Sequence, residues 1–150
     1  MIGKNDDTLG FLVHDVARML RTLIDQRVEK YNITRAKWQA LGVLDVNEGI
    51  TQTELAQALE LERSTIGRLV DRLEERGFVT RQPDPKDRRV FRIYISDTAR
   101  PLLEELEDVA EEVRSIALTG LTDTQANELK RMLTTVKKNL QDKAEDTAKS

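Results

Sequence analysis

The side chains in this sequence that could carry chemistry are arginines and short hydroxyl side chains on one face of an expected helix. Thr65, Arg68 and Arg72 are spaced by three and four residues, which places them on the same helix face, and Ser64 lies beside them. Side chains of these types can hydrogen-bond to base edges in the major groove of DNA. The same pattern is also typical of a solvated amphipathic helix, so this helix alone does not decide between the two interpretations.

A second group of charged side chains lies at the tip of an expected β-hairpin. Residues 78–81 and 90–95 are rich in β-branched and aromatic residues, and the stretch between them contains two prolines. A projecting tip with two arginines could enter the narrow, electronegative minor groove of DNA, although charged turns are also common on protein surfaces. The tip consists of Lys86, Asp87, Arg88 and Arg89.

Charge is distributed unevenly along the chain. The net charge of the 150 residues is -3, which by itself does not favour a nucleic-acid partner. Residues 62–92, however, carry nine basic and six acidic side chains, whereas residues 1–61 and 97–150 are both net acidic. A basic segment between acidic ends is the distribution expected of a DNA-reading lobe on an acidic scaffold.

Enzymes and metalloproteins are disfavoured by the composition. The chain has no cysteine and a single histidine, His14, which excludes disulfides, cysteine nucleophiles, thiolate zinc sites and multi-histidine metal sites. No glycine-rich phosphate loop or nucleophile–base pair is present. We therefore predict no enzymatic activity, no catalytic residues, no bound metal and no cofactor.

The expected location is the cytoplasm, with no membrane partner. No apolar run approaches the roughly 18 residues that span a bilayer. The polar, acidic start, residues 1–7, does not have the pattern of a secretion signal.

The elements that must position the two charged groups follow from hydrophobic periodicity and capping residues. We expect a mainly α fold with a small β-hairpin, in which a winged helix-turn-helix of about residues 33–96 is flanked by long terminal helices, about 7–32 and 97–146. Because a small lobe cannot bury the apolar stripes of the terminal helices, we expect these helices to form a homodimer interface. Helices are expected over residues 9–31, 34–49, 51–60, from the turn near residue 60 to 77, over 96–120, and from 122 onward, with fraying after 143. Ser96 is expected to cap the fifth of these helices.

The segment between Glu62 and Arg81 resembles the recognition helix and first wing strand of the MarR family of bacterial regulators. Residues 84–89, Asp-Pro-Lys-Asp-Arg-Arg, resemble the Asp-x-Arg wing signature of that family, and residues 31–41 resemble its SlyA-like branch. The resemblance implies a single MarR-type domain over 1–150 that binds double-stranded DNA as a homodimer on a pseudo-palindromic operator. It also implies a repressor that is commonly released by a small anionic aromatic effector.

Carried over residue by residue, the resemblance assigns base contacts to the start of the helix and minor-groove contacts to the wing. Asp87 takes the position of the carboxylate that braces the wing by pairing with an arginine, for which Arg72 is the expected partner. Arg72 and Lys86 complete the expected DNA-binding set. The base-reading positions are Ser64, Thr65 and Arg68, and the wing arginines are Arg88 and Arg89.

An effector pocket between the DNA lobe and the terminal helices is expected from the same resemblance. Its candidate residues are an aromatic wall, Trp38, and three cationic or titratable side chains, His14, Arg18 and Arg21. Trp38 equally suits core packing, and His14 equally suits an interface or surface position.

Two alternative functions remain open at this point. The chain could be a winged-helix module that binds another protein, or a DNA-binding regulator or anti-silencer that responds to no ligand. A protein-binding module would not need Arg68 and Arg89 together on one surface.

Overall fold

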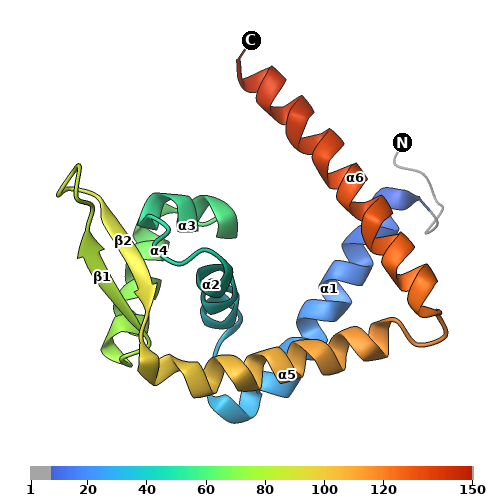
Figure 1. Ribbon diagram of the computed structural model, residues 1–150, viewed down its shortest axis with the longest axis horizontal. Helices are drawn as coiled ribbons and strands as arrows, with labels where there is room; N and C mark the ends of the chain where they lie inside the picture. Colours follow the sequence, from blue (N-terminus) through green and yellow to red (C-terminus); the bar gives the residue numbers. More distant parts are fainter. Residues whose placement is uncertain (1–7, 150) are drawn as a thin grey trace. The chain divides into compact units, whose positions relative to one another are not determined.

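The computed structural model describes residues 8–149 and confirms the mainly α winged-helix fold (Figure 1). The described chain divides into two compact units at Val113, so that α5 begins in the first unit and ends in the second. The helices and strands are α1 (Leu9–Val28), α2 (Arg35–Val46), α3 (Gln52–Leu59), α4 (Arg63–Glu75), β1 (Val79–Pro83), β2 (Phe91–Ile95), α5 (Arg100–Ala117) and α6 (Asp123–Ala148), with short 3-10 helices at Glu29–Tyr31 and Asp97–Ala99.

The core of the first unit lies between α2, α3, α4 and the hairpin. Burial of these apolar side chains removes them from water, which is the main force that holds a lobe of this size together. The entire apolar stripe of α4 takes part, so the opposite side of α4 is left at the surface. The buried side chains include Leu41 and Leu44 of α2, Leu55 of α3, Ile66, Leu69, Val70 and Leu73 of α4, and Ile93 of β2.

Two of the expected helix starts are confirmed as capping boxes. At the start of α3, the N–H of Glu54 donates to the Thr51 hydroxyl over 3.1 Å, and the N–H of Thr51 donates to the Glu54 carboxylate over 2.9 Å. Thr122 and Gln125 form the same reciprocal pair at the start of α6. These local bonds satisfy backbone donors that have no partner within the helix, and they fix where each helix begins.

The hairpin is attached to the rest of the first unit through the edge of β2 that does not pair with β1. Its strands pair antiparallel from Val79↔Ile95 to Pro83↔Phe91. On the other edge of β2, Gly49 donates its N–H to the Ile93 carbonyl, and Ile93 donates its N–H to the Ile50 carbonyl, both over 3.0 Å. The hairpin is therefore attached to the segment that leads into α3.

Polar contacts tie the end of α1 and the first part of α5 to each other and to the lobe. Arg27 of α1 pairs with Glu112 of α5 at 2.9 Å, and the Tyr31 hydroxyl donates to Glu105. Val28 is fully buried. The first half of α1 differs, because its large apolar side chains are exposed: Leu9, Phe11, Leu12, Val13, Val16 and Met19.

The second unit consists of the end of α5, a turn and α6. No residue of α6 is buried in the part of the chain that the structure describes. Its exposed large apolar side chains recur at helical spacing: Leu129, Met132, Leu133 and Leu140. Each unit therefore presents an apolar surface, as expected for helices that pack against another chain.

Two expectations about chain ends and caps are wrong. Ser96 was expected to cap the fifth helix, but its side chain makes no capping bond, and its hydroxyl instead donates to the carbonyl of Gly77. The tail after residue 143 was expected to fray, but α6 continues to Ala148. That segment is rich in good helix formers, and the Thr147 hydroxyl donates back to the carbonyl of Lys143 over 3.0 Å.

Within residues 8–149, no helix has the length and apolarity that a membrane crossing requires. The expectation that the chain start is not a secretion signal concerns residues 1–7, which lie outside the described residues.

A stability test follows from the turn between α3 and α4. Glu60 ends α3 with φ of 54°, a left-handed conformation that is costly for residues with a Cβ. We expect Glu60→Gly to raise the free energy of unfolding by about 0.5–1 kcal/mol, because the relief of strain exceeds the entropic cost of glycine. Gln57→Gly, within the same helix, should lower it by about 1 kcal/mol. Urea denaturation of both variants measures the difference, and destabilisation by Glu60→Gly would contradict this account.

Candidate DNA-binding surface

The surface of α4 opposite the core carries the residues that were predicted to contact bases. Ser64, Thr65, Arg68 and Arg72 are all exposed, and their spacing along α4 puts them on neighbouring positions of one side. The Nε of Arg68 donates to the Ser64 carbonyl of the same helix over 3.3 Å. Glu62 occupies the N-cap position of α4 without a side-chain capping bond.

The base of the wing is organised by Asp84, whose role the sequence analysis missed. Asp84 is only 7% exposed. Its carboxylate accepts the N–H groups of Lys86 and Asp87, over 2.7 and 3.3 Å, and the Nε of Arg92 over 2.6 Å. Arg92 also donates to the Gly49 carbonyl over 2.8 Å, so the carboxylate links the wing loop to the segment before α3.

These bonds change the acidity of Asp84. The N–H of Lys86 and the Arg92 guanidinium stabilise the ionised form and hold the pKa of Asp84 below its usual value. The sequence contained a signal for this turn, because an aspartate side chain in a loop often accepts the backbone N–H of the residue two positions later. The partner Arg92, eight residues away on the other strand, could not be identified from spacing.

The brace on the wing tip has a different partner from the expected one. Asp87 pairs with Arg89 rather than with Arg72: its two oxygens accept Nε and Nη2 of Arg89, over 3.0 and 3.1 Å. The backbone N–H of Arg89 donates to the same carboxylate over 3.0 Å. A pair two residues apart closes with less loss of chain entropy than a pair between the loop and α4. The pKa of Asp87 is lowered mainly by the Arg89 side chain.

Arg89 is exposed although it is paired. Its side chain is 90% exposed. An ion pair this accessible to water is weak, so Arg89 can exchange the carboxylate for a phosphate or a base edge at little cost. The loop therefore orients the guanidinium without withdrawing it from the surface.

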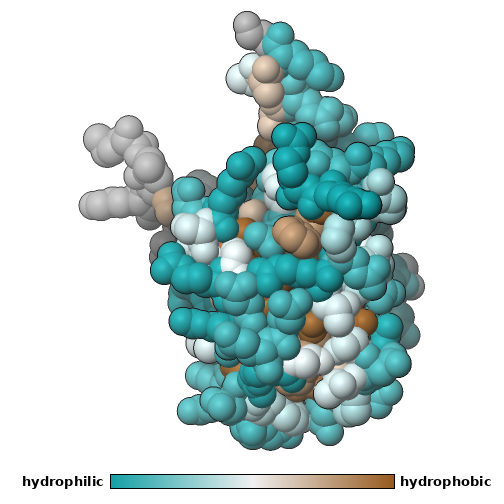
Figure 2. Space-filling model, turned by 90° about the vertical axis from the view of Figure 1, so that its left-hand side faces the viewer, coloured by the Kyte–Doolittle hydropathy of each residue, from teal (hydrophilic) through white to brown (hydrophobic). Residues whose placement is uncertain are grey.

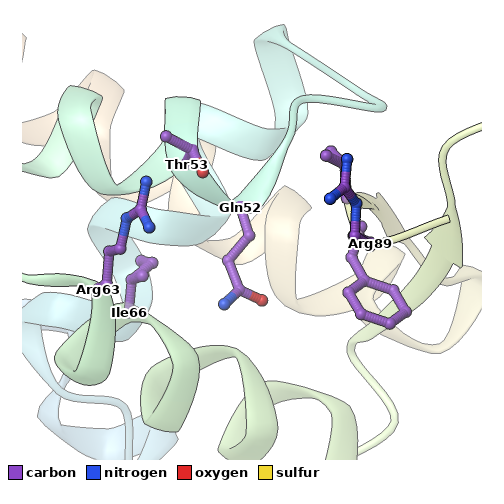
Figure 3. Close-up of a pocket in the computed structure, with 7 residues that line it drawn as sticks. Gln52, Thr53, Arg63, Ile66 and Arg89 are labelled. Atoms are coloured by element: carbon purple, nitrogen blue, oxygen red, sulfur yellow. The ribbon is translucent and has the colours of Figure 1, made fainter. Parts of the chain in front are cut away.

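A hollow of about 310 Å³ lies between α4 and the wing. Figure 3 shows Arg63 from the start of α4 on one side and Arg89 from the wing on the other, with Gln52 and Thr53 of α3 between them. Ile66, Val90 and Phe91 complete the lining. Arg63 was not among the predicted site residues, although its place at the start of an arginine-rich helix could have indicated it.

The side of the molecule on which the hairpin lies is largely hydrophilic, with hydrophobic side chains visible between the polar ones (Figure 2). In residues 8–149, no group of three or more histidine or carboxylate side chains is placed to hold a metal ion. The surface formed by α4, the start of α3 and the wing carries arginine, hydroxyl and amide side chains. Groups of these types contact the phosphates and bases of nucleic acids.

Two of the four predicted effector residues, His14 and Trp38, line different cavities. His14 lines a hollow near the start of α1 with Thr8, Gly10 and Phe11. Trp38 lines a different cavity, of about 150 Å³, which is formed by α1, α2 and α5.

The polar groups near Trp38 already have partners within the chain. The indole N–H donates to Asp25 over 2.8 Å, and Arg35 binds the same carboxylate. Arg18 pairs with Asp15 at 3.5 Å, and the charge of Arg21 acts on Asp25. Effector binding by these residues stays a prediction.

Comparison with known proteins agrees with this geometry. The sequence model of the MarR family matches residues 31–90. A MarR transcriptional regulator from Methanosarcina mazei Go1 is 27% identical, with 87% of this chain and 94% of that chain covered and a TM-score of 0.80. A cysteine-to-serine mutant of MarR from E. coli, solved in complex with operator DNA, is 25% identical, with coverages of 85% and 92% and a TM-score of 0.72.

The transcriptional regulator SlyA has a similar fold as well. It is 26% identical, with 89% of this chain and 94% of that chain covered and a TM-score of 0.75. This identity does not exceed that of the archaeal structure, so membership of the SlyA-like branch stays a prediction.

The ionised form of Asp84 should be required for a stable wing. Because its pKa is lower in the folded than in the unfolded protein, its contribution is present above the unfolded value, about 3.9, and is lost as pH falls through the folded value. We expect Asp84→Asn to lower the melting temperature at pH 7, with a difference from wild type that shrinks in acid. Asp142→Asn, on the exposed face of α6, is the matched control. Melting curves between pH 3 and 7 that run parallel for Asp84→Asn and wild type would contradict the role of the charge.

Proposed function

We propose that this protein is a MarR-type homodimeric repressor that binds a pseudo-palindromic operator in double-stranded DNA, because the MarR family model matches residues 31–90 and the fold is similar to that of a MarR regulator. The observation that carries the proposal is the exposed polar side of α4 beside an arginine wing on the same lobe. The similarity to a regulator solved with its operator DNA supports it. Such a repressor would act in the cytoplasm, in contact with chromosomal DNA.

Helix α4 would supply the base contacts in the major groove. Its buried stripe fixes which side faces outward, so Ser64, Thr65 and Arg68 are presented without rearrangement. A guanidinium can bind the two acceptors of a guanine, and hydroxyl groups can bind several bases. Arg72, one turn further along, would reach the DNA backbone or a flanking base.

The wing would contact the adjacent minor groove. Asp84 fixes the base of the loop and Asp87 orients Arg89, so the tip is ordered before DNA arrives. An arginine in a narrow minor groove senses its negative potential more than its base sequence. The wing would therefore add affinity and a preference for A·T-rich flanks, and Lys86 and Arg88 would add backbone contacts.

The hollow between the two elements would face the DNA backbone that separates the two grooves. A phosphate there would meet the Arg63 guanidinium and the Thr53 hydroxyl, which are typical phosphate donors. This arrangement favours DNA over a protein partner, because all three sets of donors would be satisfied by one duplex.

The response to a small effector distinguishes a ligand-controlled repressor from the alternative, a DNA-binding regulator that responds to no ligand. The cavity beside Trp38, at about 150 Å³, is smaller than the roughly 300–1,000 Å³ of ordinary ligand pockets. A small anionic aromatic effector would therefore have to enlarge it or bind where two subunits meet. This small size favours the alternative of a regulator that responds to no ligand.

Dimer formation is proposed from the apolar side chains of the terminal helices. The first half of α1 and the length of α6 expose large apolar residues that each unit leaves uncovered. A second copy of the chain would bury both surfaces and set the distance between two α4 helices. Two-fold symmetry of the protein would then match the symmetry of the operator.

The dimer is tested by a charge on the apolar side of α6. Leu133 is 42% exposed, and we expect Leu133→Asp to convert the protein to monomers at micromolar concentration because it would bury an unpaired carboxylate. Thr135→Asp, on the opposite side of the same helix, should leave the dimer intact. Sedimentation velocity distinguishes the two results. A wild-type chain that sediments as a monomer would refute the dimer.

DNA binding is tested by arginine variants on α4 and the wing. Arg68→Ala should cost roughly 1–3 kcal/mol per contact and relax the preference at one position of each half-site. Arg89→Ala should weaken binding to operator and scrambled DNA alike and reduce the salt dependence. Fluorescence anisotropy at two salt concentrations measures both, with Arg131→Ala on α6 as the control. Wild-type affinity that does not change between about 50 and 200 mM salt would contradict DNA binding itself.

A further inference from the structure

Arg81 of β1 has a guanidinium that is mostly withdrawn from water and was not assigned to any function above. Its side chain is 17% exposed, whereas arginine side chains are usually at the surface. It lies where β1, the start of α3 and the middle of α4 come together. A charge held in such a place requires partners on every side, because removal from water is costly.

The partners of Arg81 belong to two helices. Nη1 pairs with Asp71 at 2.7 Å and with Glu74 at 3.2 Å, and Nη2 donates to the Gly67 carbonyl over 3.1 Å. Nε donates to the side-chain oxygen of Gln52, at the start of α3, over 3.2 Å. All three nitrogens of one planar group are therefore bonded, and they connect β1 to α3 and α4.

The backbone at this position adds a further connection. Arg81 pairs with Ile93 across the hairpin, and its N–H donates to the second oxygen of Glu74 over 3.2 Å. Glu74 thus accepts both the main chain and the side chain of one residue. A strand that is held in this way cannot shift along α4 without breaking several bonds to charged groups.

The contacts on α4 follow one line along the helix. Gly67, Asp71 and Glu74 are spaced by four and three residues, so they share a face. Arg68 and Arg72 each come one residue later in the chain, on the adjacent side that would face DNA. The bonds to Arg81 therefore fix how far α4 is rotated and advanced relative to the wing.

We propose that Arg81 is a positioning residue that fixes the wing relative to α4, so that both can contact one duplex together. This inference rests on the proposed DNA-binding function. The other strand, β2, is held to residues 49–51 through Arg92 and the Ile93 bonds, so the wing keeps that attachment when Arg81 is removed. What it loses are the guanidinium bonds to Gly67, Asp71 and Glu74 of α4, while the backbone N–H of residue 81 can still donate to Glu74.

The geometry of the guanidinium matters more than its charge. Arginine offers five donors in a rigid fork, and here the fork reaches a helix carbonyl, an amide and two carboxylates. Lysine would keep an ion pair with Asp71 or Glu74 but could not hold both helices. The position of the wing in Arg81→Lys should therefore resemble that in Arg81→Met more than that in the wild type. Arg81→Lys should nevertheless fold more readily than Arg81→Met, because it keeps an ion pair.

A distance measurement tests the position of the wing without DNA. The chain contains no cysteine, so spin labels can be attached at Lys86→Cys on the wing tip and Glu75→Cys at the end of α4. Dilution with unlabelled protein restricts the signal to one protomer. We expect a narrow distance distribution in the otherwise wild-type chain and a broad or shifted one with Arg81→Met or Arg81→Lys. Arg100→Met is the matched control and should keep the distribution narrow, because it removes an arginine that pairs at 3.8 Å with Asp45 of α2 and with Glu48 just after that helix.

A double-mutant cycle tests the consequence for DNA binding. Arg89→Ala should weaken operator binding several-fold in the wild-type background but by less than about twofold in the Arg81→Met background, because the wing is then already misplaced. Equal losses in the two backgrounds would overturn the proposal, as would an unchanged distance distribution in both Arg81 variants. If Arg81→Met does not fold, as judged by its melting curve, Arg81→Lys replaces it in both measurements. A wild-type protein that fails to bind DNA would refute the proposed function. The distance measurement, which needs no DNA, would then decide whether Arg81 positions the wing.

Discussion

The burial of one stripe of α4 is the constraint on which the rest of the lobe depends. Ile66, Leu69, Val70 and Leu73 pack into the core, and their removal from water provides much of the energy that holds α4 in place. Since a helix has a fixed period, this burial also decides which side chains face outward. The side of α4 that carries Arg68 and Arg72 faces the solvent because the opposite, apolar side is buried in the core. The stability of the lobe and the proposed DNA recognition therefore depend on the same helix, and a change in the packing of α4 would alter both.

The wing depends on a different kind of interaction. A two-stranded hairpin is marginal in water, so this one needs attachments to the lobe. Arg92, which Asp84 holds within the hairpin, supplies one of them by donating to the Gly49 carbonyl. Arg81 supplies another by donating to the Gly67 carbonyl and by pairing with two carboxylates of α4. Such bonds are directional, whereas apolar packing is not. They suit an element that must keep a defined position while its tip stays exposed.

The distribution of charge reconciles an acidic chain with an anionic partner. The acidic residues of α5 and α6 lie outside the segment that includes α4 and the wing, where basic residues are in excess. Some acidic residues in that segment, Asp71, Glu74, Asp84 and Asp87, bind arginines of the lobe. They act as internal partners that orient guanidinium groups. The Asp87 carboxylate, which pairs with Arg89, can be replaced there by a phosphate.

The order of the elements, the starts of α3 and α6 and the exposed side of α4 could all be predicted from the sequence, because capping boxes and helical periodicity are local patterns. Much of the candidate DNA-binding surface followed from them. The pairing of Asp87 with Arg89, the bond from Ser96 to Gly77 and the attachment of the wing by Asp84 and Arg81 became known from the folded chain. These pairings depend on which charged groups the fold brings within hydrogen-bond distance. Among so many arginines and carboxylates, spacing along the chain cannot select the partners, whereas the packing of α4 and the hairpin does.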